Sequence, residues 1–177
     1  LQLIYTEDLQ TAYHNIAACK IDEARVMKGQ GLYNQALQHL QQAMAAMGDN
    51  APKQQIESEM ASWHSMNGDY EQAIRLYQGV LDKDPNNDAV LNNLAICYAR
   101  LGDYARSLAL QEQALRHNPH NPELLTNVAT TYFRQGNYRQ ALQIIDNAAG
   151  QFRSKQGENS AAYAAALVNK AACLAMM

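Results

Sequence analysis

The sequence lacks the features that mark several large classes of protein. It has only two Phe and one Trp although 47% of its residues are hydrophobic, so its apolar content is mainly Ala, Leu and Met, which favours helices. No run of Lys and Arg is present and the formal net charge is −3, which argues against nucleic-acid binding. No apolar segment approaches the length of a membrane span, and no signal peptide is visible. We therefore expect neither a nucleic-acid partner nor direct membrane insertion.

Residues typical of metal, cofactor or catalytic sites are also scarce. The cysteines are Cys19, Cys97 and Cys173, which are too few and too far apart for a disulfide framework. His117 and His120 have the spacing of metal ligands, but they flank a proline turn and no Cys or carboxylate cluster lies nearby. Each glycine belongs to a repeat or a turn, so no phosphate-binding loop is present. We expect no metal, no cofactor and no catalytic residues, and hence not an enzyme.

What the sequence does contain is a unit that recurs with a period of 34 residues. Its clearest copy runs from Asp88 to Asn121 and includes Gly102, Tyr104 and Pro119. One period earlier stand Gly68, Tyr70, Ala73 and Pro85, and one period later stand Gly136, Tyr138 and Ala141. A fixed period of this length indicates a solenoid in which each unit buries its apolar face against its neighbours.

The period divides the chain into segments. We expect an N-terminal helix or partial repeat at 1–16, repeats at 17–50, 54–87, 88–121 and 122–153, an insertion at 154–163, and the first helix of a truncated repeat at 164–177. Leu3, Ile4 and Leu9 give the first segment a helical pattern, as the second helix of an earlier repeat or as a cap. The spacing between the last two repeats is 42 residues instead of 34, and the eight extra residues either lengthen the flanking helices or form an exposed loop. The chain stops in mid-repeat, so we expect it to be part of a longer protein.

Two kinds of residue in the turns have predictable roles. The repeated glycines are expected to adopt a left-handed backbone conformation, and they are Gly31, Gly68, Gly102 and Gly136. Asp69, Asp103 and Asn137 follow three of them and are expected to cap the next helix with their side-chain oxygens. Small residues at 24, 61, 95, 129 and 171, and at 36, 73, 107 and 141, should allow close helix packing, with Cys97 and Cys173 buried beside them.

This pattern of Leu-Ala, an aromatic residue, Gly-x-Tyr, Ala and Pro resembles the tetratricopeptide repeat signature, from about Ala17 to Met177. The resemblance implies an all-α fold, a right-handed α-solenoid of helix-turn-helix units. In this family the first helices line a concave face that typically binds an extended peptide or a partner helix. Single positions depart from the signature, namely Glu57, His64, Gln111, Arg153 and Lys170.

The resemblance also assigns residues of this chain to the concave face. The predicted site consists of Glu59, Ser62, Asn92, Asn93, Ile96, Arg100, Thr126, Asn127, Thr130, Arg134 and Asn169, with Asp22, Arg25 and Val168 beside them. Asn93, Asn127 and Asn169 recur once per repeat, and we call them the asparagine ladder. A side-chain amide has two donor hydrogens and an acceptor oxygen, so the ladder can pair with a peptide backbone of any sequence. The alternative is that these residues only solvate the helices.

Arg100 and Arg134 recur near the ends of two first helices. They can meet a partner's carboxylates, or they can be solvated charges at a helix C-terminus that need no partner.

The pattern favours a scaffold that binds an extended peptide or partner helix during assembly of a multiprotein complex. Two alternatives are a substrate-recruiting or regulatory arm of a larger enzyme and a secretion or pilus assembly chaperone. We expect a protein or peptide partner, with self-association through exposed solenoid ends as a further route. A cytoplasmic location is expected, or a periplasmic or membrane-associated one if a leader or anchor precedes residue 1.

Overall fold

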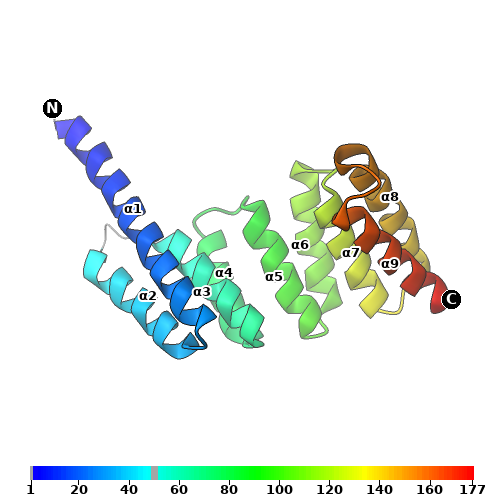
Figure 1. Ribbon diagram of the computed structural model, residues 1–177, viewed down its shortest axis with the longest axis horizontal. Coiled ribbons are helices and arrows are strands. Elements are labelled where there is room, and N and C mark those ends of the chain that lie inside the picture. The colour runs from blue at the N-terminus through cyan, green and yellow to red at the C-terminus, as the bar shows by residue number, and fades with distance from the viewer. Residues whose placement is uncertain (1, 49–51) are drawn as a thin grey trace. The chain divides into compact units, whose positions relative to one another are not determined.

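The computed structural model describes residues 2–48 and 52–177, with side chains from residue 10 onward. Within these ranges the chain forms nine α-helices and no strand (Figure 1). The helices are α1 Gln2–Gly29, α2 Tyr33–Met47, α3 Lys53–Asn67, α4 Tyr70–Leu81, α5 Asp88–Arg100, α6 Tyr104–His117, α7 Pro122–Arg134, α8 Tyr138–Gln156 and α9 Ala161–Ala175. The predicted boundary at Asn50 and the side chains of Leu3, Ile4 and Leu9 lie outside the described residues.

The helices form two compact units, Leu1–Val80 and Leu81–Met177. In the first unit α1 packs against α2 and α3, and α2 packs against α3. Their shared core is built from small and medium apolar residues together with one Trp, and its buried members include Ala17, Ile21, Ala24, Leu40, Ile56, Met60 and Trp63. Leu76 of α4 packs against this cluster.

Helix α1 is continuous for 28 residues, so no helix boundary separates 1–16 from the first repeat. The idea that the first segment is the second helix of an earlier repeat is therefore wrong. The reason is visible in the sequence, because no Gly or Pro occurs between residues 2 and 28 to end the helix. The helix ends only at Gly29, where Gly31 follows with a φ of 80°.

In the second unit the first helices of successive repeats touch each other: α5 contacts α7, and α7 contacts α9. Each also packs on its own second helix, α5 on α6 and α7 on α8, while α8 packs on α9. Small buried residues permit these approaches, since Ala95 is fully buried in α5 and Ala129 is 3% exposed in α7. Ala171, at the same repeat position in α9, is exposed. The prediction of close packing is wrong there, because α9 packs against α7 and α8 and neither of these helices covers Ala171.

Side-chain caps fix where the helices of the second unit begin. The amides of the first turn donate to Asn87 at the start of α5, to Asn121 at the start of α7 and to Ser160 at the start of α9. The predicted cap at Asp103 is confirmed, because its Oδ1 accepts from the amide of Arg106 at 3.1 Å.

The predicted cap at Asn137 is wrong. Its side chain makes no cap bond, and its Nδ2 donates to Gln135 Oε1 at 2.9 Å. Unlike the carboxylate of Asp103, the amide of Asn137 carries donor hydrogens, so a neighbouring acceptor can turn it away from the helix. In the first unit, Asp69 Oδ2 accepts from Asn67 Nδ2 at 2.9 Å.

The extra residues between the last two repeats mainly lengthen a helix. Helix α8 has 19 residues where α6 has 14, and only residues 157–160 connect it to α9. An ion pair between Arg153 and Glu158 ties the end of α8 to this connection. Lys155 Nζ also donates to the carbonyl oxygen of His120 at 2.9 Å, which joins α8 to the turn before α7.

The turn glycines adopt the predicted left-handed conformation, with φ values from 80° to 90° at residues 31, 68, 102 and 136. A Cβ built at Gly102 meets no heavy atom within 4 Å, so only the backbone conformation requires glycine there. We expect Gly102→Ala to lower the free energy of unfolding by about 1–2 kcal/mol in a denaturant titration. Gly150 lies inside α8 with the same open space, so Gly150→Ala should instead raise it by about 0.5–1 kcal/mol. Equal signs for the two variants would contradict this reasoning.

Candidate functional site

The predicted site residues of the second unit lie on three neighbouring helices, α5, α7 and α9. Helical spacing aligns Asn92, Ile96 and Arg100 along α5, and Thr126, Thr130 and Arg134 along α7. We call the surface that carries these residues, together with Asn93, Asn127 and Asn169, the α5–α7–α9 face.

One member of the asparagine ladder is bonded across two helices. Asn127 Nδ2 donates to Asn92 Oδ1 at 2.9 Å, with both side chains half-buried. The bond joins α7 to α5 and leaves Asn127 with one donor hydrogen and its acceptor oxygen, while Asn92 keeps both donor hydrogens. Asn92, which was also predicted as a site residue, is thus the direct partner of Asn127.

The side-chain amides of the other two ladder residues remain available for hydrogen bonding. Within the described part of the chain, neither the half-buried side chain of Asn93 nor the exposed side chain of Asn169 has a hydrogen-bond partner. A half-buried side chain whose amide has no protein partner makes fewer hydrogen bonds to water than an exposed one. A ligand that pairs with Asn93 would replace those lost hydrogen bonds.

The threonines of α7 present acceptors rather than donors. Thr126 Oγ1 donates to the carbonyl oxygen of Pro122 at 2.7 Å, and Thr130 Oγ1 donates to that of Thr126 at 2.9 Å. Because each hydroxyl proton is committed to the backbone, only the oxygen lone pairs remain for a ligand. The α7 part of the face therefore combines hydroxyl acceptors with the amide of Asn127.

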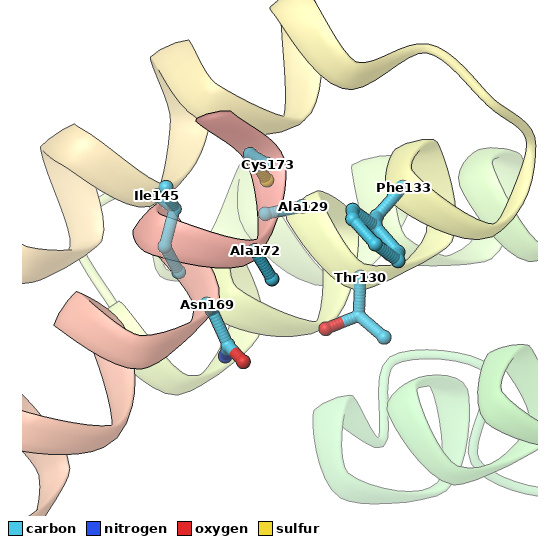
Figure 2. Close-up of a pocket in the computed structure, with 7 residues that line it drawn as sticks. All are labelled: Ala129, Thr130, Phe133, Ile145, Asn169, Ala172 and Cys173. Carbon is cyan, nitrogen blue, oxygen red and sulfur yellow. The ribbon is translucent and has the colours of Figure 1, made fainter. Parts of the chain in front are cut away.

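A small pocket opens between α7 and α9, and Ile145 of α8 also lines it (Figure 2). Its volume is about 80 Å³, and its lining consists of Ala129, Thr130, Phe133, Ile145, Asn169, Ala172 and Cys173. Figure 2 shows the side chains of Thr130 and Asn169 extending toward the same side, with Ala172 between them. We call this site the α7–α9 pocket.

The side chain of Cys173 is an uncharged part of the lining of the α7–α9 pocket. It is 3% exposed, and burial, with a smaller contribution from the charge of Asp146, raises the pKa of its thiol. The thiol is therefore protonated at neutral pH and packs as a small apolar group. The prediction that Cys97 and Cys173 are buried is confirmed.

The face is positively charged toward the C-terminal ends of its helices. Arg100 and Arg134 are exposed, and neither has an ion-pair partner among residues 10–48 and 52–177. Lys170 of α9 is already neutralised by Asp146 of α8, with 2.6 Å between Nζ and Oδ1. The two arginines are therefore the cations of this face that remain available to a ligand.

Three of the four predicted residues of the first unit, Asp22, Arg25 and Glu59, are hydrogen-bonded to one another. Arg25 Nε and Nη2 donate to the two oxygens of Glu59 at 2.8 and 3.0 Å, and Trp63 Nε1 donates to Glu59 Oε1 at 2.9 Å. Asp22 accepts a further bond from Arg25 at 3.1 Å. The bond to Glu59 raises the pKa of Arg25. Glu59 is thus a structural partner in α3, and Ser62 is half-buried on the same helix.

Sequence reasoning did not assign five of the residues that line the α7–α9 pocket to the site: Ala129, Phe133, Ile145, Ala172 and Cys173. It named Ala129 and Cys173 only as small packing residues. Phe133 could have been found, since it lies three residues after Thr130 on the same side of α7. Ile145 belongs to a second helix, and no spacing within α7 or α9 indicates it.

The described residues contain neither a candidate metal site nor a candidate membrane-spanning helix. No group of three or more His, Cys, Asp or Glu side chains there is arranged to hold a metal ion. None of the helices described is both long and apolar enough to cross a membrane.

Comparison with known families agrees with the helix pairing. Two sequence models described as tetratricopeptide repeat match residues 66–122 and 99–170, and together they cover residues 66–170 of the 177. The chain belongs to the tetratricopeptide repeat family. No curated protein sequence matches it. Tetratricopeptide repeats generally mediate protein–protein interactions, and that general role applies to this chain.

Solved structures of tetratricopeptide repeat proteins share the fold. One from Parabacteroides merdae is 20% identical with a TM-score of 0.69, covering 91% of this chain, which spans 61% of that protein. The repeats of a putative kinesin light chain from Podosopora anserina are 17% identical with a TM-score of 0.74, covering 90% and 85%. The TPR2B domain of yeast Sti1, solved in a complex with pHsp70, is 17% identical with a TM-score of 0.63, covering 71% and 98%. The predicted all-α solenoid of tetratricopeptide repeats is confirmed.

Proposed function

We propose that the chain binds an extended peptide segment of a partner protein across the α5–α7–α9 face, and so acts as a scaffold in assembly of a multiprotein complex. The observation that carries the proposal is the half-buried side chain of Asn93, which has no hydrogen-bond partner among the described residues and lies next to the bonded pair Asn92 and Asn127. With Asn169 on the next helix, amide groups are offered on all three first helices of the second unit. A peptide backbone presents the matching donors and acceptors at regular intervals.

The structure of the Sti1 domain in a complex with pHsp70 supports this use of the fold, since it shows a related architecture holding a partner. The charge of the face adds a preference. Arg100 and Arg134 favour a peptide with carboxylates, because an exposed guanidinium can form a charge-assisted pair without losing an existing one.

The test is the triple variant Asn93→Ala, Asn127→Ala, Asn169→Ala. Peptides are first selected on the unmodified protein from a displayed library of random heptapeptides, and their affinities are then measured by fluorescence anisotropy. Each neutral hydrogen bond contributes about 0.5–1.5 kcal/mol, so the variant should bind roughly ten- to a thousandfold more weakly. Its helical circular dichroism should be unchanged, because the replaced residues are at most half-buried.

A matched control keeps the number of substitutions constant. Asn34, Asn147 and Asn159 are exposed and lie outside the α5–α7–α9 face, so their joint replacement by Ala should leave affinity unchanged. If the ladder variant binds the selected peptides as tightly as this control does, the proposed function is wrong and the ladder only solvates its helices.

A further inference from the structure

The α7–α9 pocket lies between two helices of the α5–α7–α9 face, and an inference about its occupant rests on the proposed function. Five of its seven lining residues are apolar: Ala129, Phe133, Ile145, Ala172 and Cys173. The two polar ones, Thr130 and Asn169, extend toward one side of it (Figure 2). An apolar pocket edged by hydrogen-bonding groups suits a side chain whose own backbone stays outside.

The volume of the pocket limits what can enter. A cavity of about 150 Å³ lined by aliphatic and aromatic residues holds benzene. The α7–α9 pocket has about 80 Å³, so it is too small for an aromatic ring and suits a branched aliphatic side chain. Phe133 and Ile145 provide the broad apolar contact that such a side chain needs.

The edge of the pocket fits the backbone of the same residue. Thr130 offers oxygen lone pairs because its proton is committed to the carbonyl of Thr126, so it can accept from a peptide amide. Asn169 is exposed, and its amide can donate to a peptide carbonyl. The two groups come from different helices, so an extended residue placed between them is held on both sides.

The charge near the pocket defines the next feature of the occupant. Arg134 lies one helical turn beyond Thr130 on α7, about 5–6 Å along the helix, and it has no ion-pair partner in the described part of the chain. An extended peptide advances about 3.3 Å per residue. A carboxylate within two residues of the inserted side chain therefore comes within reach of this guanidinium.

We propose that the α7–α9 pocket sets the register of the bound peptide by accepting one branched aliphatic side chain, Val or Ile, and that an acidic residue within two positions of it pairs with Arg134. Burial of a side chain of this size corresponds to about ten- to hundredfold in affinity. Phe, Tyr and Trp at that position are excluded by size.

The test fills the pocket and leaves the amides in place. Ala172 is exposed and lines the pocket, so Ala172→Leu puts three more carbons into it without disturbing a buried contact. Ala171→Leu makes the same change at the next residue, which is exposed and does not line the pocket. Random heptapeptides displayed on phage are selected on the unmodified protein, and synthetic copies of the enriched peptides are titrated against both variants.

The expected result has three parts. Enriched peptides share one position held by Val or Ile with Asp or Glu within two residues, Ala172→Leu weakens them about ten- to hundredfold, and Ala171→Leu leaves them unchanged. Arg134→Gln should weaken peptides with the acidic residue and leave unchanged their copies in which Gln or Asn replaces it.

The outcomes separate the two proposals. Peptides lost by the asparagine-ladder variant but bound equally by Ala172→Leu and Ala171→Leu would overturn the pocket and leave the proposed function standing. An enriched position held by an aromatic residue would also overturn the pocket. Peptides that bind the ladder variant normally, or no enriched peptide at all, would contradict both.

Discussion

Replacing Leu91 with alanine is expected to lower the free energy of unfolding by about 2–5 kcal/mol. Leu91 is 1% exposed and lies in a cluster with Ala114 of α6 and Leu124 of α7. It therefore joins three helices across the boundary between two repeats. In a solenoid each repeat is stabilised only through its neighbours, so a cavity at such a boundary weakens both the repeats that meet there.

The measurement is a urea titration followed by far-ultraviolet circular dichroism, with Leu101→Ala as the matched control. Leu101 is 45% exposed at the end of the same helix, so its truncation should change the free energy of unfolding by no more than about 0.5 kcal/mol. Similar losses for the two leucines would show that the Leu91 cluster does not hold α5, α6 and α7 together.

Gln111→Leu is expected to stabilise the protein by about 1–3 kcal/mol. Gln111 is 1% exposed, and its buried Oε1 has no hydrogen-bond partner in the part of the chain that the structure describes. An oxygen buried in this way has lost its hydrogen bonds to water without gaining one from the protein, which costs about 1–3 kcal/mol. Leucine is one bond shorter than glutamine but similarly bulky, and it carries no polar atom. It also restores the bulky apolar residue that the repeat signature favours at this position.

The same titration tests this prediction, with Gln143→Leu as the control. Gln143 is exposed on α8, so its replacement should change the free energy of unfolding by no more than about 0.5 kcal/mol. A destabilised Gln111→Leu variant would mean that the buried amide is satisfied in solution.

The period of 34 residues was enough to predict the features that every repeat shares. The left-handed turn glycines, the helix pairs and the buried small residues such as Ala95 follow from it because they are properties of a single unit and its nearest neighbour. The cap at Asp103 was predictable for the same reason. The repeat pattern indicated a helix boundary near residue 17, whereas the absence of Gly and Pro between residues 2 and 28 indicated a continuous α1. The second indication was the correct one.

Contacts between repeats were harder to predict. Arg25 and Glu59 are 34 residues apart, so opposite charges at one repeat position could have indicated their ion pair. The bond from Asn127 to Asn92 joins positions one residue out of register, which the ladder alone does not indicate. The α7–α9 pocket depends on how α7, α8 and α9 pack together, and this packing is absent from the pattern of any one helix.

The central claim is that the α5–α7–α9 face binds an extended peptide, and the side-chain amide signals of its asparagines test it most directly. A ¹⁵N-labelled sample of the whole chain is titrated with a peptide enriched on it, and the assigned Asn side-chain signals are followed by nuclear magnetic resonance. We predict that the signals of Asn93, Asn127 and Asn169 shift while those of Asn34 and Asn147 stay in place. Shifts confined to Asn34 and Asn147 would contradict the account and place the peptide on another surface.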